Sequence, residues 1–417
     1  MTIDSSNARQ YDLVVWGASG FTGRLVAEYL LERYGTDGQL QWALGGRNRA
    51  KLEWIRDELG QTSANIPILI GDSRDPESLD TIVTRSSVVC STVGPFARYG
   101  TDLVAACARH GTDYCDIAGE VQWMRRMIDG YEAQAHATGA RIVHCCGFDS
   151  IPSDLGCLFM NERMRERTGQ PCAEVKFRVR KMRGAFSGGT VASLLNVLDE
   201  CRRDRKVRRL LLDPYGLNPD DQRRGLDGPD QWGPRWDADV GWTAPFVMAA
   251  INTRVVRRSN ALMDYSYGPD FRYSEAVMTG RGPGGWVVAS AIAAGMGGFL
   301  AAAAVAPTRA LLNKLLLPQP GEGPSKEQRK NGFFDVVLVG KSGGADKLLL
   351  RGRLKGNRDP EYGATSRMLA ESAVCLARDG DALEVEGGFW TPASCMGPHL
   401  IARLARSADV TFELDAD

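Results

Sequence analysis

In the first third of the chain, short apolar runs alternate with amphipathic segments, and this alternation constrains the fold more than any other feature. The apolar runs have strand length, and helical spacing of apolar residues separates several of them. Because alternating strands and helices form βαβ units, we expect a parallel sheet with helices on both faces. The predicted strands are 11–16, 41–44, 66–70, 87–93, 113–117 and 141–146, and the predicted helices are 23–34, 50–59, 101–110 and 122–137.

The turn after the first predicted strand has the sequence of a phosphate-binding loop. Residues 17–23 form a G-x-x-G-x-x-G pattern that leads directly into a helix. Glycines let the backbone turn tightly and let a pyrophosphate approach, and the helix N-terminus offers free N–H groups. This context predicts a dinucleotide-binding, doubly wound Rossmann-type sheet, with a glycine-rich turn that holds no ligand as the alternative. The candidate binding residues are Gly17, Ser19, Gly20, Phe21, Thr22 and Gly23.

The end of the second strand distinguishes NAD from NADP. Enzymes that use NAD place an acid there, which binds the ribose 2′-hydroxyl. Residues 45–49 read Gly-Gly-Arg-Asn-Arg, and Arg47 can bind a 2′-phosphate through two hydrogen bonds. We therefore expect NADP(H), with an exposed loop arginine as the alternative. Strand topology places Asp72 and Ser73 near the adenine, and Val93, Gly94, Pro95 and Phe96 near the nicotinamide.

The regular alternation ends near residue 154, and a second domain is expected there. We predict an NADP-binding domain over 1–150, a substrate domain of α/β (α+β) type over 151–359, and C-terminal helices over 360–417 that return to the first domain. Within the later regions we predict strands 174–182, 333–339 and 347–354, helices 191–209, 365–377 and 393–405, and a long loop region over 213–245. The basic run 202–209 is interpreted as a solvated helix end.

Charge and composition exclude several classes of protein. Lys+Arg and Asp+Glu both number 51, which argues against a nucleic-acid partner. No Cys or His residues have zinc-site spacing, so no metal is expected. The polar first ten residues lack a secretory signal, so we expect a cytoplasmic protein. The Tyr-x-x-x-Lys pair of short-chain dehydrogenases and the G-x-S-x-G elbow of α/β-hydrolases are also absent.

Residues 286–306 form an uncharged, apolar segment of helical length. Its length would span a bilayer core, and Arg281 and Arg309 flank it. Its many small residues also suit close packing, inside the protein or between the subunits of a homodimer. We favour burial within the protein. Peripheral attachment to the inner face of the plasma membrane and a full span are the alternatives.

Several stretches together resemble the saccharopine dehydrogenase-like oxidoreductases. They are 17–23, 94–100, 111–120, 252–261, 391–397 and, most specifically, Cys146-Gly-Phe-Asp-Ser-Ile-Pro-Ser-Asp-Leu-Gly156. The resemblance covers nearly the whole chain and is strongest to the branch that includes the mycobacterial trans-acting enoyl reductases. It implies the fold, an NADPH cofactor and an apolar, polyketide-derived acyl substrate in glycolipid biosynthesis. It does not identify a catalytic residue.

The candidate catalytic residues are Asp149, Ser150 and Tyr99, because each follows a strand whose carboxyl end faces the expected nicotinamide. Asp149 or Ser150 would position the substrate or relay the proton that follows hydride transfer. The alternative is that residues 147–154 are only a capped crossover between domains. Glu120 is a second-rank candidate by the same argument.

The arginines of the second region have a structural and a functional interpretation. We expect Arg254, Arg257 and Arg258 on a salt-bridged surface strand, with binding of substrate phosphates as the alternative.

The sequence therefore favours an NADPH-dependent oxidoreductase that reduces a C=C bond in a lipid-like acyl chain. Two alternatives remain open. One is a non-catalytic dinucleotide-binding or lipid-associated scaffold, because no acid–base pair stands out. The other is an amino-acid reductase of the saccharopine type, which would need a clustered basic pocket for its polycarboxylate substrate.

Overall fold

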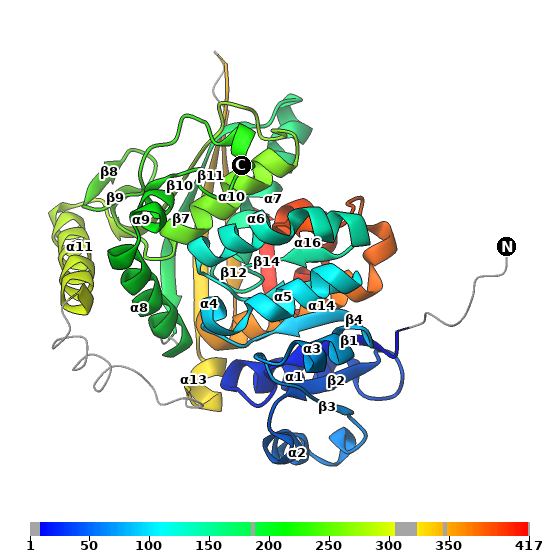
Figure 1. Cartoon of the computed structure of the whole chain (residues 1–417). Coiled ribbons are helices and arrows are strands. Elements are labelled where there is room, and N and C mark those ends of the chain that lie inside the picture. Colours follow the sequence, from blue (N-terminus) through cyan, green and yellow to red (C-terminus); the bar gives the residue numbers. More distant parts are fainter. Residues whose placement is uncertain (1–8, 185–187, 305–322, 345–347, 416–417) are drawn as a thin grey trace.

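The computed structural model describes residues 9–184, 188–304, 323–344 and 348–415. The first of its two sheets has seven parallel strands in the order β13-β6-β5-β4-β1-β2-β3. These strands are β1 (Tyr11–Trp16), β2 (Trp42–Gly46), β3 (Ile68–Ile70), β4 (Ser86–Ser91), β5 (Asp113–Asp116), β6 (Arg141–Val143) and β13 (Gly388–Trp390). Strands β1 to β4 of this sheet are labelled in Figure 1. The order reverses between β1 and β4, as in a doubly wound sheet, and confirms the predicted fold class.

Helices cover both faces of this sheet because its central strands are apolar on both sides. In β1, Leu13 and Val15 face one hydrophobic cluster, whereas Val14 and Trp16 face another. The first face carries α1 (Phe21–Tyr34) and α14 (Thr365–Arg378), and the second carries α3 (Pro76–Val83), α5 (Thr101–His110) and α6 (Val121–Thr138). The short helices α2 (Arg49–Glu58) and α4 (Phe96–Tyr99) follow β2 and β4.

The second sheet is mixed and has the order β14-β12-β11-β7-β10-β9-β8. Among the strands of this sheet that the structure describes, only β7 and β10 pair in parallel. One hydrophobic cluster runs from β1 through α7 (Ile151–Thr168) to β7, so the two domains share a core. The strands are β7 (Cys172–Arg183), β8 (Arg235–Asp237), β9 (Gly241–Ala244), β10 (Arg272–Gly280), β11 (Phe333–Ser342), β12 (Leu349–Gly356) and β14 (Val410–Leu414).

The structure corrects two predictions in the second region. The helix predicted over 191–209 is two helices, α8 (Gly188–Arg203) and α9 (Arg205–Leu212). Asp204 lies between them in extended conformation and caps α9, since its carboxylate accepts a 2.7 Å hydrogen bond from Lys206 N. The predicted loop region 213–245 contains the edge strand β8 and its neighbour β9, which are too short to show a periodic pattern.

The predicted surface strand at Arg254, Arg257 and Arg258 is also wrong. These residues lie in α10 (Ala249–Leu262), and all three side chains are buried. Arg254 pairs with Asp230 at 2.8 Å and Arg257 with Asp227 at 2.7 Å. The Arg258 guanidinium donates hydrogen bonds to two backbone carbonyls, at Leu217 and Phe389. The three guanidinium groups are therefore engaged in ion pairs and hydrogen bonds inside the protein. The alternative, that they bind substrate phosphates, has no support.

The C-terminal region returns to the first domain and also completes the second. Helix α14 packs on the first sheet, and β13 extends that sheet beyond β6. Strand β14 instead pairs with β12. The predicted helix 393–405 is divided into α15 (Pro392–Cys395) and α16 (Gly397–Ser407).

The apolar segment is helical, but it lies on the surface of the chain. Helix α11 (Pro283–Ala304) contacts β9 and β10, and it lies at the left-hand edge of the molecule in Figure 1. Only 11% of its most apolar 18-residue window is buried, so the favoured interpretation of burial within the protein is wrong. Residues 305, 306 and 309 of the prediction lie outside the described residues. Helix α13 (Lys326–Lys330) follows and lies near α1, where Lys326 pairs with Glu28 at 3.1 Å.

Candidate active site at the carboxyl edge of the first sheet

Two of the three loop glycines are required by the fold. Gly17 has a φ of 86°, and a Cβ there would lie 2.5 Å from Val93 Cγ2. A Cβ at Gly23 would lie 2.3 Å from the Gly17 carbonyl oxygen. Gly20 differs, because it is exposed, has a φ of −82°, and a Cβ there would meet nothing closer than 3.2 Å. Gly20 is thus the glycine that borders open space at the start of α1.

The start of α1 fits a pyrophosphate. No side chain caps the helix at Gly20, and its first turn contains no acidic residue. Within the described chain, the hydroxyls of Ser19 and Thr22 make no hydrogen bond. Free N–H groups, a positive helix end and unused hydroxyl donors are the groups that bind a dinucleotide phosphate.

The β4 loop is held against the phosphate loop. Thr92, a residue missed by the sequence analysis, donates hydrogen bonds to Trp16 O from its hydroxyl at 3.1 Å and from its backbone N–H at 3.0 Å. Val93 and Pro95 are half-buried and Gly94 is exposed, so this turn is accessible at the sheet edge. The Phe96 ring is buried 5.5 Å from the Trp123 ring, and it therefore supports the loop from behind.

Glu120 has a structural role at this edge. Its buried carboxylate accepts hydrogen bonds from Phe96 N at 2.7 Å, from Ala97 N at 3.2 Å and from the Ser193 hydroxyl at 3.0 Å. Burial raises the pKa of Glu120, whereas these donors act in the opposite direction. The interaction fixes α4 and joins α8 to the first domain.

The other predicted residues lie along the same edge. Tyr99 ends α4, is half-buried, and has the Arg74 guanidinium 5.6 Å from its ring centre. The Asp72 carboxylate accepts a 3.0 Å hydrogen bond from Arg74 N, and the neighbouring Ser73 is half-buried. The edge therefore contains both the expected adenine residues and Tyr99, linked through Arg74.

Arg47 is available for a phosphate. It follows β2, is exposed, and forms no ion pair with any described residue. The next residue, Asn48, caps α2 by accepting a 3.0 Å hydrogen bond from Lys51 N, which fixes the backbone beside Arg47. Arg49, by contrast, lies 3.8 Å from Glu53.

We expect Arg47→Ala to weaken NADPH binding by about 1–3 kcal/mol, the scale of a charge-assisted hydrogen bond, and to leave NADH binding nearly unchanged. Titration of both cofactors by fluorescence measures the difference. Arg49→Ala is the matched control, because it removes a neighbouring guanidinium that already has a partner. Equal weakening of NADPH and NADH would show that Arg47 is structural.

The carboxyl group of Asp149 lies at this edge and differs from the other acids there, because it has no partner among the described residues and a raised pKa. It lies between β6 and α7, and it has no hydrogen bond or ion pair in the described part of the chain. Burial, together with the negative charge of Glu361, raises the pKa of Asp149 to about 8. The group therefore holds a proton at neutral pH and can donate it.

Ser150 does not lie at the mouth of the site, contrary to the sequence prediction. Its side chain is fully buried, and its hydroxyl donates a 3.1 Å hydrogen bond to Asn252 Oδ1. Asn252 in turn donates to Ser153 at 3.1 Å and to Glu275 at 3.0 Å. Ser150 thus belongs to a buried polar network that joins the start of α7 to α10 and β10.

The sequence analysis also missed the segment that covers the phosphate loop. A helical turn over Pro360–Ala364 places the Tyr362 ring 4.7 Å from the Phe21 ring, with the Arg329 guanidinium 5.5 Å from Phe21. The same turn contains Glu361, whose negative charge contributes to the raised pKa of Asp149. Phe21 therefore links the phosphate loop to a segment more than 300 residues later, a contact that no local pattern indicates.

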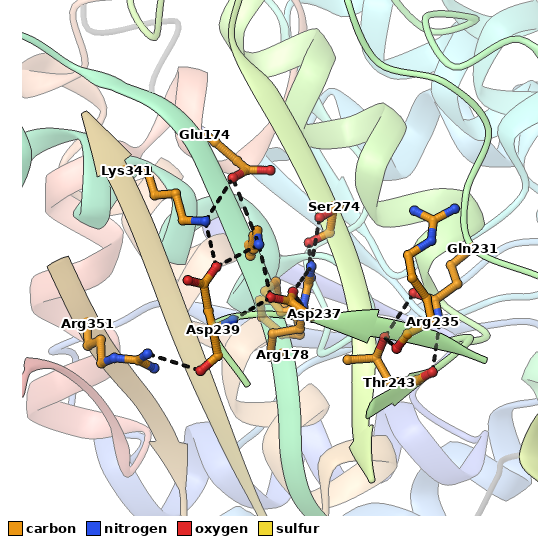
Figure 2. Close-up of polar contacts among 12 residues, drawn as sticks. Glu174, Arg178, Gln231, Arg235, Asp237, Asp239, Thr243, Ser274, Lys341 and Arg351 are labelled. Carbon is orange, nitrogen blue, oxygen red and sulfur yellow. Dashed lines mark hydrogen bonds and ion pairs between the residues drawn. The ribbon is translucent and has the colours of Figure 1, made fainter. Parts of the chain in front are cut away.

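The second domain contains a charged cavity of about 300 Å³. Ion pairs beside it connect the β8–β9 turn to β7 and β11 of the second sheet (Figure 2). Lys176 lies 3.0 Å from Asp237 and 2.7 Å from Asp239, and Lys341 lies 2.6 Å from Asp239. The lining contains five basic and five acidic residues, so it is not the clustered basic pocket of a polycarboxylate reductase.

Known proteins match both the first domain and the whole chain. Residues 13–143 match the family model of the saccharopine dehydrogenase NADP-binding domain. A trans-acting enoyl reductase of Mycobacterium ulcerans is 37% identical over 418 residues, covering 97% of this chain and 98% of the relative. One of Mycobacterium tuberculosis is 38% identical, covering 95% and 96%. A second M. tuberculosis relative, provisionally given the same name, is 42% identical and covers 96% of both chains.

The fold agrees with these matches. Apo saccharopine dehydrogenase (L-Glu forming) from Saccharomyces cerevisiae superimposes with a TM-score of 0.53 at 12% identity, covering 97% of this chain and 99% of that chain. The first domain supplies an NADP site, and the relatives share nearly the full length. The chain is therefore an NADP-dependent oxidoreductase that belongs to the saccharopine dehydrogenase-like family, in the branch of the trans-acting enoyl reductases.

Proposed function

We propose that this protein reduces an activated C=C bond in an acyl chain at the expense of NADPH. The observation that carries the proposal is the half-buried carboxyl of Asp149, which has no hydrogen bond or ion pair with a described residue and lies between β6 and α7, at the same sheet edge as the phosphate loop. Its raised pKa favours the protonated form. The full-length likeness to proteins named trans-acting enoyl reductases supports the type of bond.

Each half of the reaction has a place at this edge. The β-carbon of the conjugated C=C bond would take a hydride, which is the chemistry that a bound NADPH would supply. The α-carbon then takes a proton, which Asp149 donates, so that one C–H bond forms at each carbon and the double bond is lost. The turn at Gly20 would hold the pyrophosphate of the cofactor, and Arg47 would hold its 2′-phosphate. Thr92 and Glu120 fix the loop that follows β4 at the same edge.

The proposed substrate is an apolar, lipid or polyketide-derived acyl thioester, used in lipid or glycolipid biosynthesis. Two features support an apolar substrate over a polycarboxylate. The charges around the second-domain cavity are balanced, and α11 presents a long uncharged surface. A thioester carbonyl conjugated to the C=C bond would activate the β-carbon for hydride attack.

The test follows NADPH absorbance with enoyl thioesters of increasing chain length, and mass spectrometry of the product. We expect oxidation of NADPH with a gain of two hydrogens in the acyl chain. Tight NADPH binding without turnover would favour the non-catalytic scaffold. Turnover of an amino acid with a keto acid, but not of enoyl thioesters, would favour the saccharopine-type reductase.

We also propose that the protein works in the cytoplasm, at the inner face of the plasma membrane. An apolar acyl substrate partitions into that surface, and the exposed apolar side of α11 supports a peripheral contact. A homodimer that covers α11 is the competing arrangement. Cell fractionation distinguishes them, because a peripheral enzyme is released from the membrane fraction by detergent, whereas a dimer stays in the soluble fraction.

A further inference from the structure

Helix α11 presents an apolar surface that nothing in the described chain covers. Trp286, Val287 and Val288 are 48%, 57% and 48% exposed, and the segment 282–304 contains no charged residue. On the opposite side, Ala289 and Ala303 are fully buried. The helix contacts β9 and β10, so it is attached to the second sheet on one side only.

Exposed tryptophans gather near the start of this helix. Trp236 of β8 is 49% exposed and pairs in register with Trp242 of β9. Trp242 pairs with Gly280, whose carbonyl packs against the first turn of α11. The hairpin that carries Trp236 and Trp242, whose rings lie 5.6 Å apart, is thus joined through Gly280 to the first turn of α11, where Trp286 lies. Tryptophan prefers the boundary between water and lipid, because its ring is apolar and its N–H is polar.

A cluster of unpaired cations lies on the same side of the molecule. In Figure 1, α8 and α9 lie on the side of the second domain where α11 lies. Six basic residues, Arg202, Arg203, Arg205, Lys206, Arg208 and Arg209, are exposed, and none forms an ion pair with a described residue. Two of the neighbouring acids are engaged elsewhere, Asp204 as the cap of α9 and Glu200 with Arg126 at 2.8 Å.

This cluster is exceptional in a chain of balanced charge. Lys+Arg and Asp+Glu are equal in number, so the rest of the chain has six more acidic than basic residues. The rest of the chain therefore has a net negative charge and would be repelled by an anionic surface, whereas the cluster would be attracted to it. The cluster would therefore both attract the molecule to an anionic surface and determine which side of the molecule faces that surface.

We infer that α11 together with the α8–α9 cations forms a docking surface for an anionic lipid bilayer. The apolar side of α11 enters the interface, and the six cations contact acidic headgroups. A bilayer accounts for both features, whereas an acidic protein partner accounts only for the cations. A two-fold dimer through this face would bring the two copies of the cluster toward each other, where like charges repel. The inference extends the proposed location and does not depend on the reaction.

Vesicle flotation with the full chain tests the docking surface. We expect binding to mixed phosphatidylcholine and phosphatidylglycerol vesicles and about tenfold weaker binding to phosphatidylcholine alone. Arg208→Gln with Arg209→Gln should remove most of this preference. Trp286→Ser with Val287→Ser should weaken binding to both vesicles. High salt should abolish the preference, and detergent should release the protein completely.

Two matched controls keep the result specific. Arg163→Gln with Lys355→Gln removes two half-buried surface cations that already pair with Glu166 and Glu413. Trp54→Ser removes an indole that is 54% exposed on the first domain. Both should bind vesicles like the unaltered chain. The inference is overturned if the unaltered chain binds neither vesicle, if controls and test variants lose binding equally, or if light scattering shows a dimer that Trp286→Ser with Val287→Ser dissociates. NADPH turnover with soluble thioesters is measured separately, so failure of docking and failure of the proposed reaction are distinguishable.

Discussion

Gly20→Val is expected to abolish NADPH binding in a protein that remains folded. Gly20 is exposed at the start of α1, and a Cβ there meets only the Gly17 carbonyl, at 3.2 Å. The valine side chain would occupy the space through which a pyrophosphate reaches the helix N–H groups. Fluorescence titration with NADPH should show no binding, while the thermal unfolding transition and circular dichroism spectrum stay close to those of the unaltered chain.

The neighbouring glycines provide the contrast. Gly23→Ala should destabilise the protein itself, because a Cβ would lie 2.3 Å from the Gly17 carbonyl oxygen and the turn would have to move. Unchanged NADPH affinity in Gly20→Val would contradict the assignment of residues 17–23 as the phosphate-binding loop. Unfolding of Gly20→Val would instead show that Gly20 is required for the fold, as Gly17 and Gly23 are.

Asp149→Asn should lower kcat by about 10²–10³-fold and leave NADPH affinity unchanged. An amide cannot donate the proton that the α-carbon requires, and general acid catalysis contributes on this scale. Because the donor is the protonated carboxyl with a pKa of about 8, kcat of the unaltered protein should be constant at neutral pH and fall as the pH rises through about 8. Stopped-flow NADPH oxidation across this range measures both effects.

Glu361→Gln separates this role from a structural one. Burial is the main cause of the raised pKa of Asp149, and the charge of Glu361 adds to it. Removing that charge should lower the pKa and move the fall in kcat to lower pH, with little loss of rate below it. Two outcomes would contradict a role in proton transfer: a pH profile that does not move in Glu361→Gln, or normal turnover in Asp149→Asn. Either would indicate that residues 147–154 are only a capped crossover between the domains.

The sequence was most informative where function depends on neighbouring residues. Residues 17–23 form a complete phosphate loop within one turn, so the pattern itself identifies the strand, the turn and the helix. Arg47 could likewise be picked out, because it stands at the end of a strand where an acid is expected in NAD enzymes. Parallel strands that are buried on both faces appear as continuous apolar runs, which is why the first domain was predicted closely.

Only the tertiary structure could assign the remaining roles. Ser150 and Asp149 are adjacent in sequence, yet one is fully buried against Asn252 and the other keeps an unpaired carboxyl beside Glu361, 212 positions later. Arg254 and Arg257 could not be classified until α10 placed them against Asp230 and Asp227.

The composition of α11 determines that it is an apolar helix, but not what covers it. Burial depends on the area that neighbouring elements provide, and β9 and β10 cover only one side of this helix. Local sequence thus determined the helices, the strands and the phosphate loop, because these depend on spacing and on glycine geometry. The tertiary structure decided which polar groups are paired and which apolar surfaces are covered, because both depend on contacts between residues that are distant in the chain.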